Sequence, residues 1–409
     1  MSMTAVAEKT LNYSPVRKIK QPRIEAIDLL RGTVMIIMAL DHVRDYFHRD
    51  AFVFQPEDLG RTNVVLFFTR WITHFCAPVF VFLAGTAAYL YGSKRSTKEL
   101  SVFLFTRGLW LLFVELFILS FFRTFNPAYT YVHLQVIWVI GLSMMILSAA
   151  IYLNKHVLLL CGLLMILSHN LLDSLHVTGT GSLGFVWSLL HEPGHFLFGN
   201  FSIYVHYPLI PWAGVMMIGF CFGQLYTRRD HQKKRKNILR WLGATAIGLF
   251  IILRSGNFYG DAAHWSVQNK FSFSLLSFLN VTKYPPSLLY LLLTLGPAMI
   301  FLSLAEKPLN TIKKQVAVIG RVPMFYYLAH ILLIHVFATI AAYLSGYKLS
   351  DMVLSTSVQA APLLKGYGFN LFTVYLVWAG LVIFLYPFCK WFDDYKRTHL
   401  PAKKWLSYL

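Results

Sequence analysis

Long apolar runs separated by short polar segments dominate this sequence. A helix that crosses the hydrocarbon core of a bilayer needs about 20 predominantly apolar residues. Ten runs near that length occur, at 27–48, 68–92, 103–122, 134–153, 156–175, 208–227, 238–254, 286–305, 322–344 and 370–389. The pattern predicts an all-α fold, a polytopic helical bundle of about ten transmembrane helices. The segment 255–284 is long enough to contain a re-entrant piece.

Positive charge is unevenly distributed between these runs. Residues 1–26 and 393–409 are basic tails that flank a membrane domain at 27–392, and most of the 37 Lys and Arg lie in these tails and in alternate loops. The positive-inside rule therefore predicts that both termini are cytoplasmic. The net charge of +19 reflects topology, and the basic cluster at 228–236 is expected to face anionic lipid and not nucleic acid.

Composition agrees with a membrane protein and gives no sign of a metal. The chain is 56% hydrophobic and only 13% charged. Its four cysteines share no metal-ligand spacing, so neither disulfides nor zinc are expected. The stretch His191-Glu-Pro-Gly-His195 has the H-E-x-x-H pattern of zinc proteases. Pro-Gly would break the helix which that chemistry needs, so the stretch is interpreted as a turn in an outer loop.

The first run carries charges that hydrocarbon disfavours. A charge near the bilayer centre costs roughly 2.5–3.5 kcal/mol on insertion scales, which makes intramembrane ionisable residues functional candidates. Arg31 and His42 lie on one helical face about 16 Å apart along the axis. Asp28 and Arg31 are placed to form a salt bridge at the start of the helix; alternatively, Arg31 holds an anionic headgroup or the phosphates of a cytosolic donor. Asp41 points about 100° away from His42.

Other ionisable residues are expected at the depth of His42. A rise of about 1.5 Å per residue places His74, Glu115 and His335 in the same slab of the membrane. A carboxylate beside an imidazole orients the ring and raises its basicity. Alternatively, Glu115 pairs with a membrane arginine and locks helices together. Most histidines fall in the outer half or outer loops, where they occur with aromatic residues suited to sugars or to an interfacial belt.

Three stretches resemble a known superfamily. The stretch Arg-Ile-Glu-Ala-Ile-Asp-Leu-Leu-Arg-Gly at 23–32, with ten residues between Arg31 and His42, resembles the first span of the transmembrane acyltransferases. That superfamily includes acyltransferase family three and the heparan-alpha-glucosaminide N-acetyltransferase group. The stretches Tyr-Pro-Leu-Ile-Pro-Trp-Ala-Gly-Val-Met-Met-Ile-Gly at 207–219 and Gly-Arg-Val-Pro-Met-Phe-Tyr-Tyr-Leu-Ala-His-Ile-Leu-Leu-Ile-His at 320–335 resemble bacterial membrane proteins related to the second group.

The resemblance implies an acyltransferase of the bacterial cytoplasmic membrane. It implies transfer of an acetyl group from cytosolic acetyl-CoA to a hydroxyl or amine of an extracytoplasmic sugar or glycan, without a metal. In such enzymes an outward-facing histidine does the chemistry, which maps onto His42, and an intramembrane arginine maps onto Arg31. The basic pair Arg95-x-x-Lys98 departs from the Arg-x-x-Arg of some relatives.

These lines of reasoning give a set of candidate residues. The catalytic candidates are His42, Glu115 and Asp41; the donor-binding candidates are Arg31, Asp28, Arg95 and Lys98; the acceptor-binding candidates are His74, His335, His330, Asp45 and Trp212. Membrane lipid and a glycan or amino sugar are the expected partners, nucleic acid is not, and oligomerisation is left open. The same buried charges would also suit a secondary transporter or proton-coupled permease, although no inverted repeat is evident.

Overall fold

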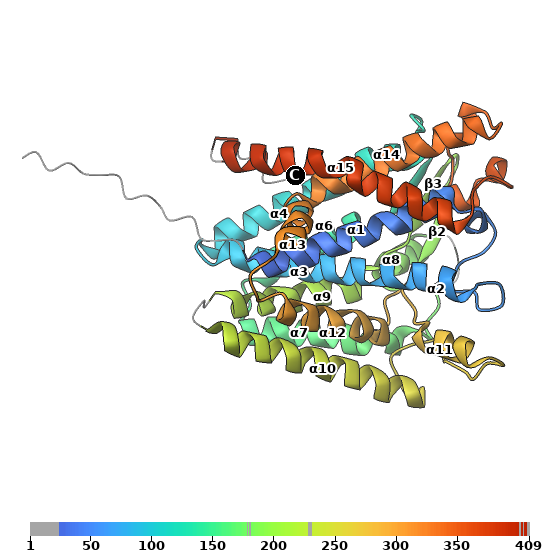
Figure 1. Cartoon of the computed structure of the whole chain (residues 1–409). Coiled ribbons are helices and arrows are strands. Elements are labelled where there is room, and N and C mark those ends of the chain that lie inside the picture. The colour runs from blue at the N-terminus through green and yellow to red at the C-terminus, as the bar shows by residue number, and fades with distance from the viewer. Residues whose placement is uncertain are drawn as a thin grey trace, which may run out of the picture.

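The computed structural model describes residues 24–177, 179, 181–227, 231–400, 402–403 and 405–406. Within these residues the chain forms a bundle of roughly antiparallel helices with a small sheet at one end (Figure 1). Most of the predicted amino-terminal tail lies outside the described residues, as do positions 228–230 of the basic cluster. At the other end of the chain, the first residues of the predicted tail 393–409 continue the last helix.

Each of the ten apolar runs coincides with a helix or a pair of joined helices. They are α1 (Glu25–Phe47), α2 (Val64–Trp71) with α3 (Cys76–Gly92), α4 (Thr97–Phe113) with α5 (Ser120–Thr124), α6 (Val136–Ala150), α7 (Lys155–Ser168), α9 (Leu209–Phe222), α10 (Gln232–Gly256), α12 (Leu288–Leu304), α14 (Pro323–Leu344) and α15 (Leu371–His399). Seven stretches of the described chain are long and apolar enough to cross a bilayer. The helices α6 and α12 are apolar but shorter, and α1, which carries several charged residues, is not among the seven, so the count of ten spans stays a prediction.

The loops contain more regular structure than the apolar pattern predicts. Three short helices, α8 (Ser182–Leu190), α11 (Phe271–Leu279) and α13 (Thr311–Arg321), lie between the long ones. Three strands, β1 (Tyr131–Leu134), β2 (Gly194–Phe198) and β3 (Phe201–Val205), form a sheet in the order β1-β3-β2. β3 pairs parallel with β1 and antiparallel with β2. Helices dominate the described residues, as the predicted all-α fold requires, and the small sheet is an addition that the apolar pattern does not predict.

The bundle has two distinct ends. Successive long helices alternate in direction, so α1, α4 and α10 begin at one end and α3, α9 and α12 finish there (Figure 1). This end carries the exposed Lys94, Lys98, Lys233 and Lys234, and it is called the basic end below. The opposite end carries the three strands and is called the sheet end.

Helix α1 lies against several other helices and packs most closely on α13. Gly32 and Gly320 make this approach possible, because a Cβ on Gly32 would overlap the Val316 carbonyl oxygen and a Cβ on Gly320 would overlap that of Asp28. Small residues allow helix backbones to come this close. The contact fixes the position of α1 along the bundle, and with it the charged residues that α1 carries.

Candidate active site

Two adjoining cavities lie at the sheet end. The larger, about 420 Å³, is called the sheet-end cavity, and the smaller holds about 50 Å³. His42, Asp45, His133, Gln135 and Gln359 line both of them. The polar wall of the sheet-end cavity also includes Asp41, Arg44, Gln55, Glu57, Arg70, Thr73, Tyr204, His206, Tyr207, Lys283, Tyr284 and Tyr327. The wall therefore combines residues of α1 with residues of loops and strands.

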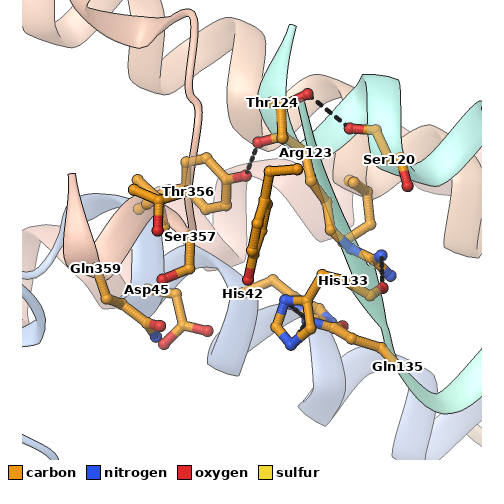
Figure 2. Close-up of a pocket in the computed structure, with 14 residues that line it drawn as sticks. His42, Asp45, Ser120, Arg123, Thr124, His133, Gln135, Thr356, Ser357 and Gln359 are labelled. Atoms are coloured by element: carbon orange, nitrogen blue, oxygen red, sulfur yellow. Dashed lines mark hydrogen bonds between the residues drawn. The ribbon is translucent and has the colours of Figure 1, made fainter. Parts of the chain in front are cut away.

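His42 lies where the two cavities meet. Its ring is half-buried and lies 5.3 Å from the His330 ring and 6.3 Å from the Tyr327 ring, measured between centroids. Among the described residues the His42 ring has these aromatic neighbours but no hydrogen-bond partner. Figure 2 shows it gathered with His133 and Gln135 at the edge of the smaller cavity. Both ring nitrogens are therefore free to bind a ligand.

His330 supports His42 from behind. It is fully buried on α14, and its Nδ1 lies 2.9 Å from the Tyr326 carbonyl oxygen. A carbonyl oxygen only accepts hydrogen bonds, so Nδ1 carries the proton and Nε2 is left as an acceptor. That Nε2 is buried without a partner. The structure thus places His330, a predicted acceptor-binding residue, beside His42. His330 lies behind the cavity wall and is not part of it.

Carboxylates and cations alternate along one side of the sheet-end cavity. Arg70 binds Asp41 and also donates from Nε to Glu57 Oε1 at 2.8 Å. Arg44 Nη2 lies 3.0 Å from Asp41 Oδ1 and 2.6 Å from Asp45 Oδ1. Burial raises the pKa of Glu57, but the Arg70 guanidinium, the His74 ring and Arg44 together outweigh it and hold the pKa well below its usual range. Glu57 is therefore ionised. Asp41, predicted as a catalytic neighbour of His42, instead forms ion pairs with the two arginines.

A second chain of hydrogen bonds has a fixed direction. The Gln135 amide nitrogen, which only donates, lies 2.9 Å from His133 Nδ1, and His133 Nε2 lies 3.0 Å from His206 Nδ1. His133 Nε2 and His206 Nε2 must then carry protons in the neutral rings, and His206 Nε2 has no partner. Burial and the neighbouring His206 lower the pKa of His133, while burial and Lys283 lower the pKa of His206. Neutral His206 therefore offers a free donor at the cavity wall.

Glu115 pairs with an arginine and not with His42. It is fully buried in a π-helical segment, Val114–Leu119, and its Oε1 accepts from Arg123 Nη1 at 2.7 Å. The same oxygen accepts from the backbone nitrogen of Gln135 at 3.2 Å, and Arg123 also donates to the Tyr327 hydroxyl at 3.2 Å. Glu115 thus holds cavity-wall residues in place through an ion pair and does not touch His42.

Besides His330, three further predicted acceptor-binding residues lie outside the cavity walls. His74 is buried behind Glu57, with its Nε2 3.6 Å from Glu57 Oε1. Both ring nitrogens of His335 face carbonyl oxygens, Nδ1 that of Phe122 at 2.9 Å and Nε2 that of Met352 at 3.0 Å, and the neutral ring donates to one of the two. Trp212 is fully buried, with its ring centroid 5.5 Å from that of Tyr207. Asp45 does line both cavities.

A larger cavity of about 1050 Å³ opens at the basic end. Arg31 and Asp28 line it, and Arg31 Nη1 donates to the Gly320 carbonyl oxygen at 3.1 Å. Its other cationic wall residues are Lys94, Arg235, Lys307 and Arg321. Arg95 and Lys98 are not among the wall residues; the Arg95 guanidinium instead lies 3.7 Å from the centre of the Tyr91 ring. Lys94 takes the place that the sequence analysis gave to these two residues.

One comparison with known proteins decides the family. The family model of the catalytic region of heparan-alpha-glucosaminide N-acetyltransferase matches residues 23–255, more than half of the chain. The chain belongs to this family. Among curated proteins, none gives a significant match to the chain. The resemblance found in the sequence is thereby confirmed, and the apolar helices together with the family identify an integral membrane acetyltransferase. Enzymes of this type generally take the acetyl group from acetyl-CoA.

The residues matched by the family model include the α1 residues that line the basic-end cavity and those that line the sheet-end cavity. The match includes Arg31, His42, Arg70, His133 and His206, but it ends before Lys283 and His330. For an acetyltransferase the arrangement offers an imidazole with free nitrogens, carboxylates that stabilise a cationic ring nearby, and neutral donors for a polar acceptor.

Several wall residues were not singled out from the sequence. Glu57, Lys283 and Gln359 come from loops, and His133 and His206 come from a strand and the end of a strand. Two features of the sequence pointed to this region of the molecule. One is the excess of histidine in the predicted outer half, and the other is Arg70, a charged residue inside the second apolar run.

Proposed function

We propose that this membrane acetyltransferase binds acetyl-CoA in the basic-end cavity and acetylates a sugar or glycan hydroxyl or amine in the sheet-end cavity. One observation carries the proposal: the single helix α1 lines the basic-end cavity at Arg31 and the sheet-end cavity at His42. With the basic end in the cytoplasm, as the positive-inside rule predicts, the acetyl group crosses a bacterial cytoplasmic membrane along α1.

The basic-end cavity suits the nucleotide part of the donor. Its volume is about 1050 Å³, and Arg31, Lys94 and Lys307 supply positive charge for phosphates. The three arginines of the wall each also have a carboxylate partner: Asp28 lies 3.6 Å from Arg31, Glu306 lies 2.7 Å from Arg235, and Asp393 lies 2.8 Å from Arg321. The flexible pantetheine arm would then follow α1 towards Met38, the wall residue of the sheet-end cavity that lies nearest Arg31 on this helix.

The sheet-end cavity suits a polar, neutral or weakly basic acceptor. Asp41, Asp45 and Glu57 are balanced by Arg44, Arg70 and Lys283, so the wall is close to neutral overall. The unpartnered Nε2–H of His206 and the amide of Gln359 would bind acceptor hydroxyls, while the Tyr204 and Tyr284 rings offer aromatic surface. Gln55 is exposed at the cavity wall and marks its mouth.

His42 performs the proton transfer in this proposal. Its free ring nitrogen removes the proton from the acceptor hydroxyl or amine as the acceptor atom attacks the thioester carbonyl carbon. The carbon–sulfur bond breaks, and CoA leaves as a thiolate that recovers the proton from His42. In a two-step variant His42 itself attacks the thioester and then passes the acetyl group to the acceptor. In both variants Asp41 and Asp45 stabilise positive charge on the ring.

The central experiment replaces His42 by alanine in the full-length chain purified in detergent. We expect acetyl-CoA consumption in the presence of an amino sugar or oligosaccharide acceptor to fall by about 10²–10⁴-fold, the usual contribution of a general base. The matched control is His195→Ala, because His195 lies exposed on β2 and lines neither sheet-end cavity. Gel filtration and thermal unfolding show whether each variant is folded.

Two results would contradict the proposal. A folded His42→Ala protein with wild-type turnover would remove His42 from the chemistry. Flux of the sugar into proteoliposomes without any CoA release would favour the alternative function, a secondary transporter that uses the same buried charges.

A further inference from the structure

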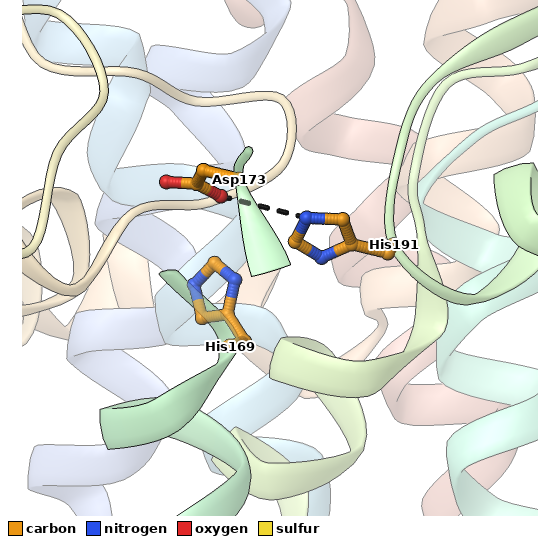
Figure 3. A group of neighbouring side chains, drawn as sticks. All are labelled: His169, Asp173 and His191. Carbon is orange, nitrogen blue, oxygen red and sulfur yellow. Dashed lines mark ion pairs between the residues drawn. The ribbon is translucent and has the colours of Figure 1, made fainter. Parts of the chain in front are cut away.

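Three side chains gather at the sheet end, outside the cavities described above. His169 begins the short 3₁₀ turn His169–Leu172 after α7, Asp173 follows that turn, and His191 caps the carboxyl end of α8. Figure 3 shows the three side chains pointing towards one another. They come from segments separated by a helix, so the fold and not local sequence brings them together.

Their spacing is close to that of metal ligands. His191 Nε2 lies 3.5 Å from Asp173 Oδ1, and one ligand atom from each residue lies within 4.8 Å of the others. Zinc bound to nitrogen or oxygen at about 2.0–2.2 Å in tetrahedral geometry places its ligand atoms roughly 3.3–3.5 Å apart. The His191–Asp173 pair already meets this spacing, and a modest rotation of the His169 side chain would complete it.

Buried nitrogen atoms without partners are the second observation. His169 is 1% exposed and His191 is 3% exposed. Neither ring nitrogen of His169 has a hydrogen-bond partner, nor does Nδ1 of His191. Burying an imidazole nitrogen without a partner costs free energy, so such atoms call for a bound group.

The aspartate is oriented for binding by a neighbour. Asn170 donates from Nδ2 to Asp173 Oδ2 at 2.8 Å, which leaves Oδ1 facing His191. The Asn170 Oδ1 atom accepts from the backbone nitrogen of Leu288 at 2.9 Å. Such outer hydrogen bonds commonly orient metal-binding carboxylates.

We propose that His169, Asp173 and His191 bind one divalent transition metal ion of the zinc type. Two imidazoles and one carboxylate are ligands that zinc accepts, and the fourth position would be open to water. The proposal departs from the sequence analysis, which expected no metal, and it reinterprets the His-Glu-Pro-Gly-His stretch. In this stretch His191 is a ligand, whereas His195 lies exposed on β2.

The metal would tie three parts of the sheet end together. It joins the end of α7 to the end of α8, and through Asn170 it is linked to the start of α12. The segment just before α12 carries Lys283 and Tyr284, which line the sheet-end cavity. The ion would therefore brace one wall of the cavity from outside without contacting the acceptor.

The test measures zinc binding by the full-length chain in detergent. The protein is stripped with a chelator, loaded with ZnCl₂ and passed over a desalting column, and its zinc is measured by mass spectrometry. We expect one zinc per wild-type chain, and binding weakened roughly tenfold or more in His191→Ala and Asp173→Asn. Zinc should also raise the unfolding temperature of the wild type and not of these variants.

Two control variants make the outcome specific. His195→Ala removes the other histidine of the stretch, and His206→Ala removes half of the histidine pair in the sheet-end cavity. Both should keep the zinc. The proposal is overturned if the stripped wild type binds no zinc, if Asp173→Asn and His191→Ala bind it as the wild type does, or if His206→Ala loses it. None of these readouts depends on acetyl transfer, so they stand apart from the function proposed above.

Discussion

At the scale of single residues, the partners of each imidazole decide what it can do. His335 is occupied at both nitrogens by backbone carbonyls, and His133 lies inside a directed chain of hydrogen bonds. His42 has neither kind of partner among the described residues. Only the side chain with free nitrogens at a cavity is in a position to react.

The His133–His206 pair predicts a dependence of stability on pH. Burial lowers the pKa of both residues below the ordinary value of 6.5, which the unfolded chain keeps. Below pH 6.5 the unfolded state therefore binds more protons than the folded state, and the free energy of unfolding falls as pH falls. Each unit by which a pKa is lowered corresponds to about 1.4 kcal/mol lost at full protonation.

Thermal unfolding in detergent between pH 7.5 and pH 5 measures this effect. The double variant His133→Gln, His206→Gln should lose less stability over this range than the wild type. His195→Gln, at an exposed site on β2, should follow the wild type. Equal slopes for the wild type and the double variant would show that the pair does not resist protonation.

At the scale of elements, run length predicted the helices and could not predict which way their side chains face. All ten apolar runs coincide with helices because each run is long enough to define one. Glu115 lies in a π-helical turn and binds Arg123, a direction that run length alone does not predict. The parallel pairing of β1 with β3 joins Tyr131 to Ser202, a contact that no local pattern reveals. Of the four residues predicted to bind the donor, Arg31 and Asp28 line the basic-end cavity, whereas Arg95 and Lys98 do not.

Both cavities depend on the packing of α1 against α13. α13 lies in a predicted basic loop, and its buried residues are the short run Ala317, Val318, Ile319 and Gly320. We predict that Gly320→Ala destabilises the protein by about 1–3 kcal/mol, because the added Cβ would overlap the Asp28 carbonyl oxygen and force α1 away. Acetyl transfer should fall as well, since Arg31 and His42 would move with α1.

A control substitution at a second helical glycine separates the effect of steric overlap from the effect of helix propensity. Gly248 lies inside α10, and a Cβ there meets no atom within 4 Å. Gly248→Ala should leave stability unchanged or raise it by roughly 0.5–1 kcal/mol. Thermal unfolding of both variants is the measurement. Wild-type stability in Gly320→Ala would mean that the two backbones are not in close contact.

At the scale of the whole molecule, the two cavities lie at opposite ends of one bundle. The donor and the acceptor would then approach from different sides of the membrane and meet at α1. This division explains why lysine and arginine gather at the basic end while histidines and the sheet gather at the other. It also makes orientation in the membrane a requirement of the proposed chemistry.

Orientation can be measured by labelling single cysteines in intact cells. In a chain whose four cysteines are replaced by alanine, Lys98→Cys would report on the basic end and His195→Cys on the sheet end, since both positions are exposed. We predict that a membrane-impermeant maleimide labels only the second in intact cells, and both after permeabilisation, because the basic end is held in the cytoplasm. Labelling of Lys98→Cys alone in intact cells would invert the orientation and place the donor cavity away from cytosolic acetyl-CoA. Labelling of both positions in intact cells would mean that the bundle does not separate two compartments, and transfer across the membrane would be ruled out.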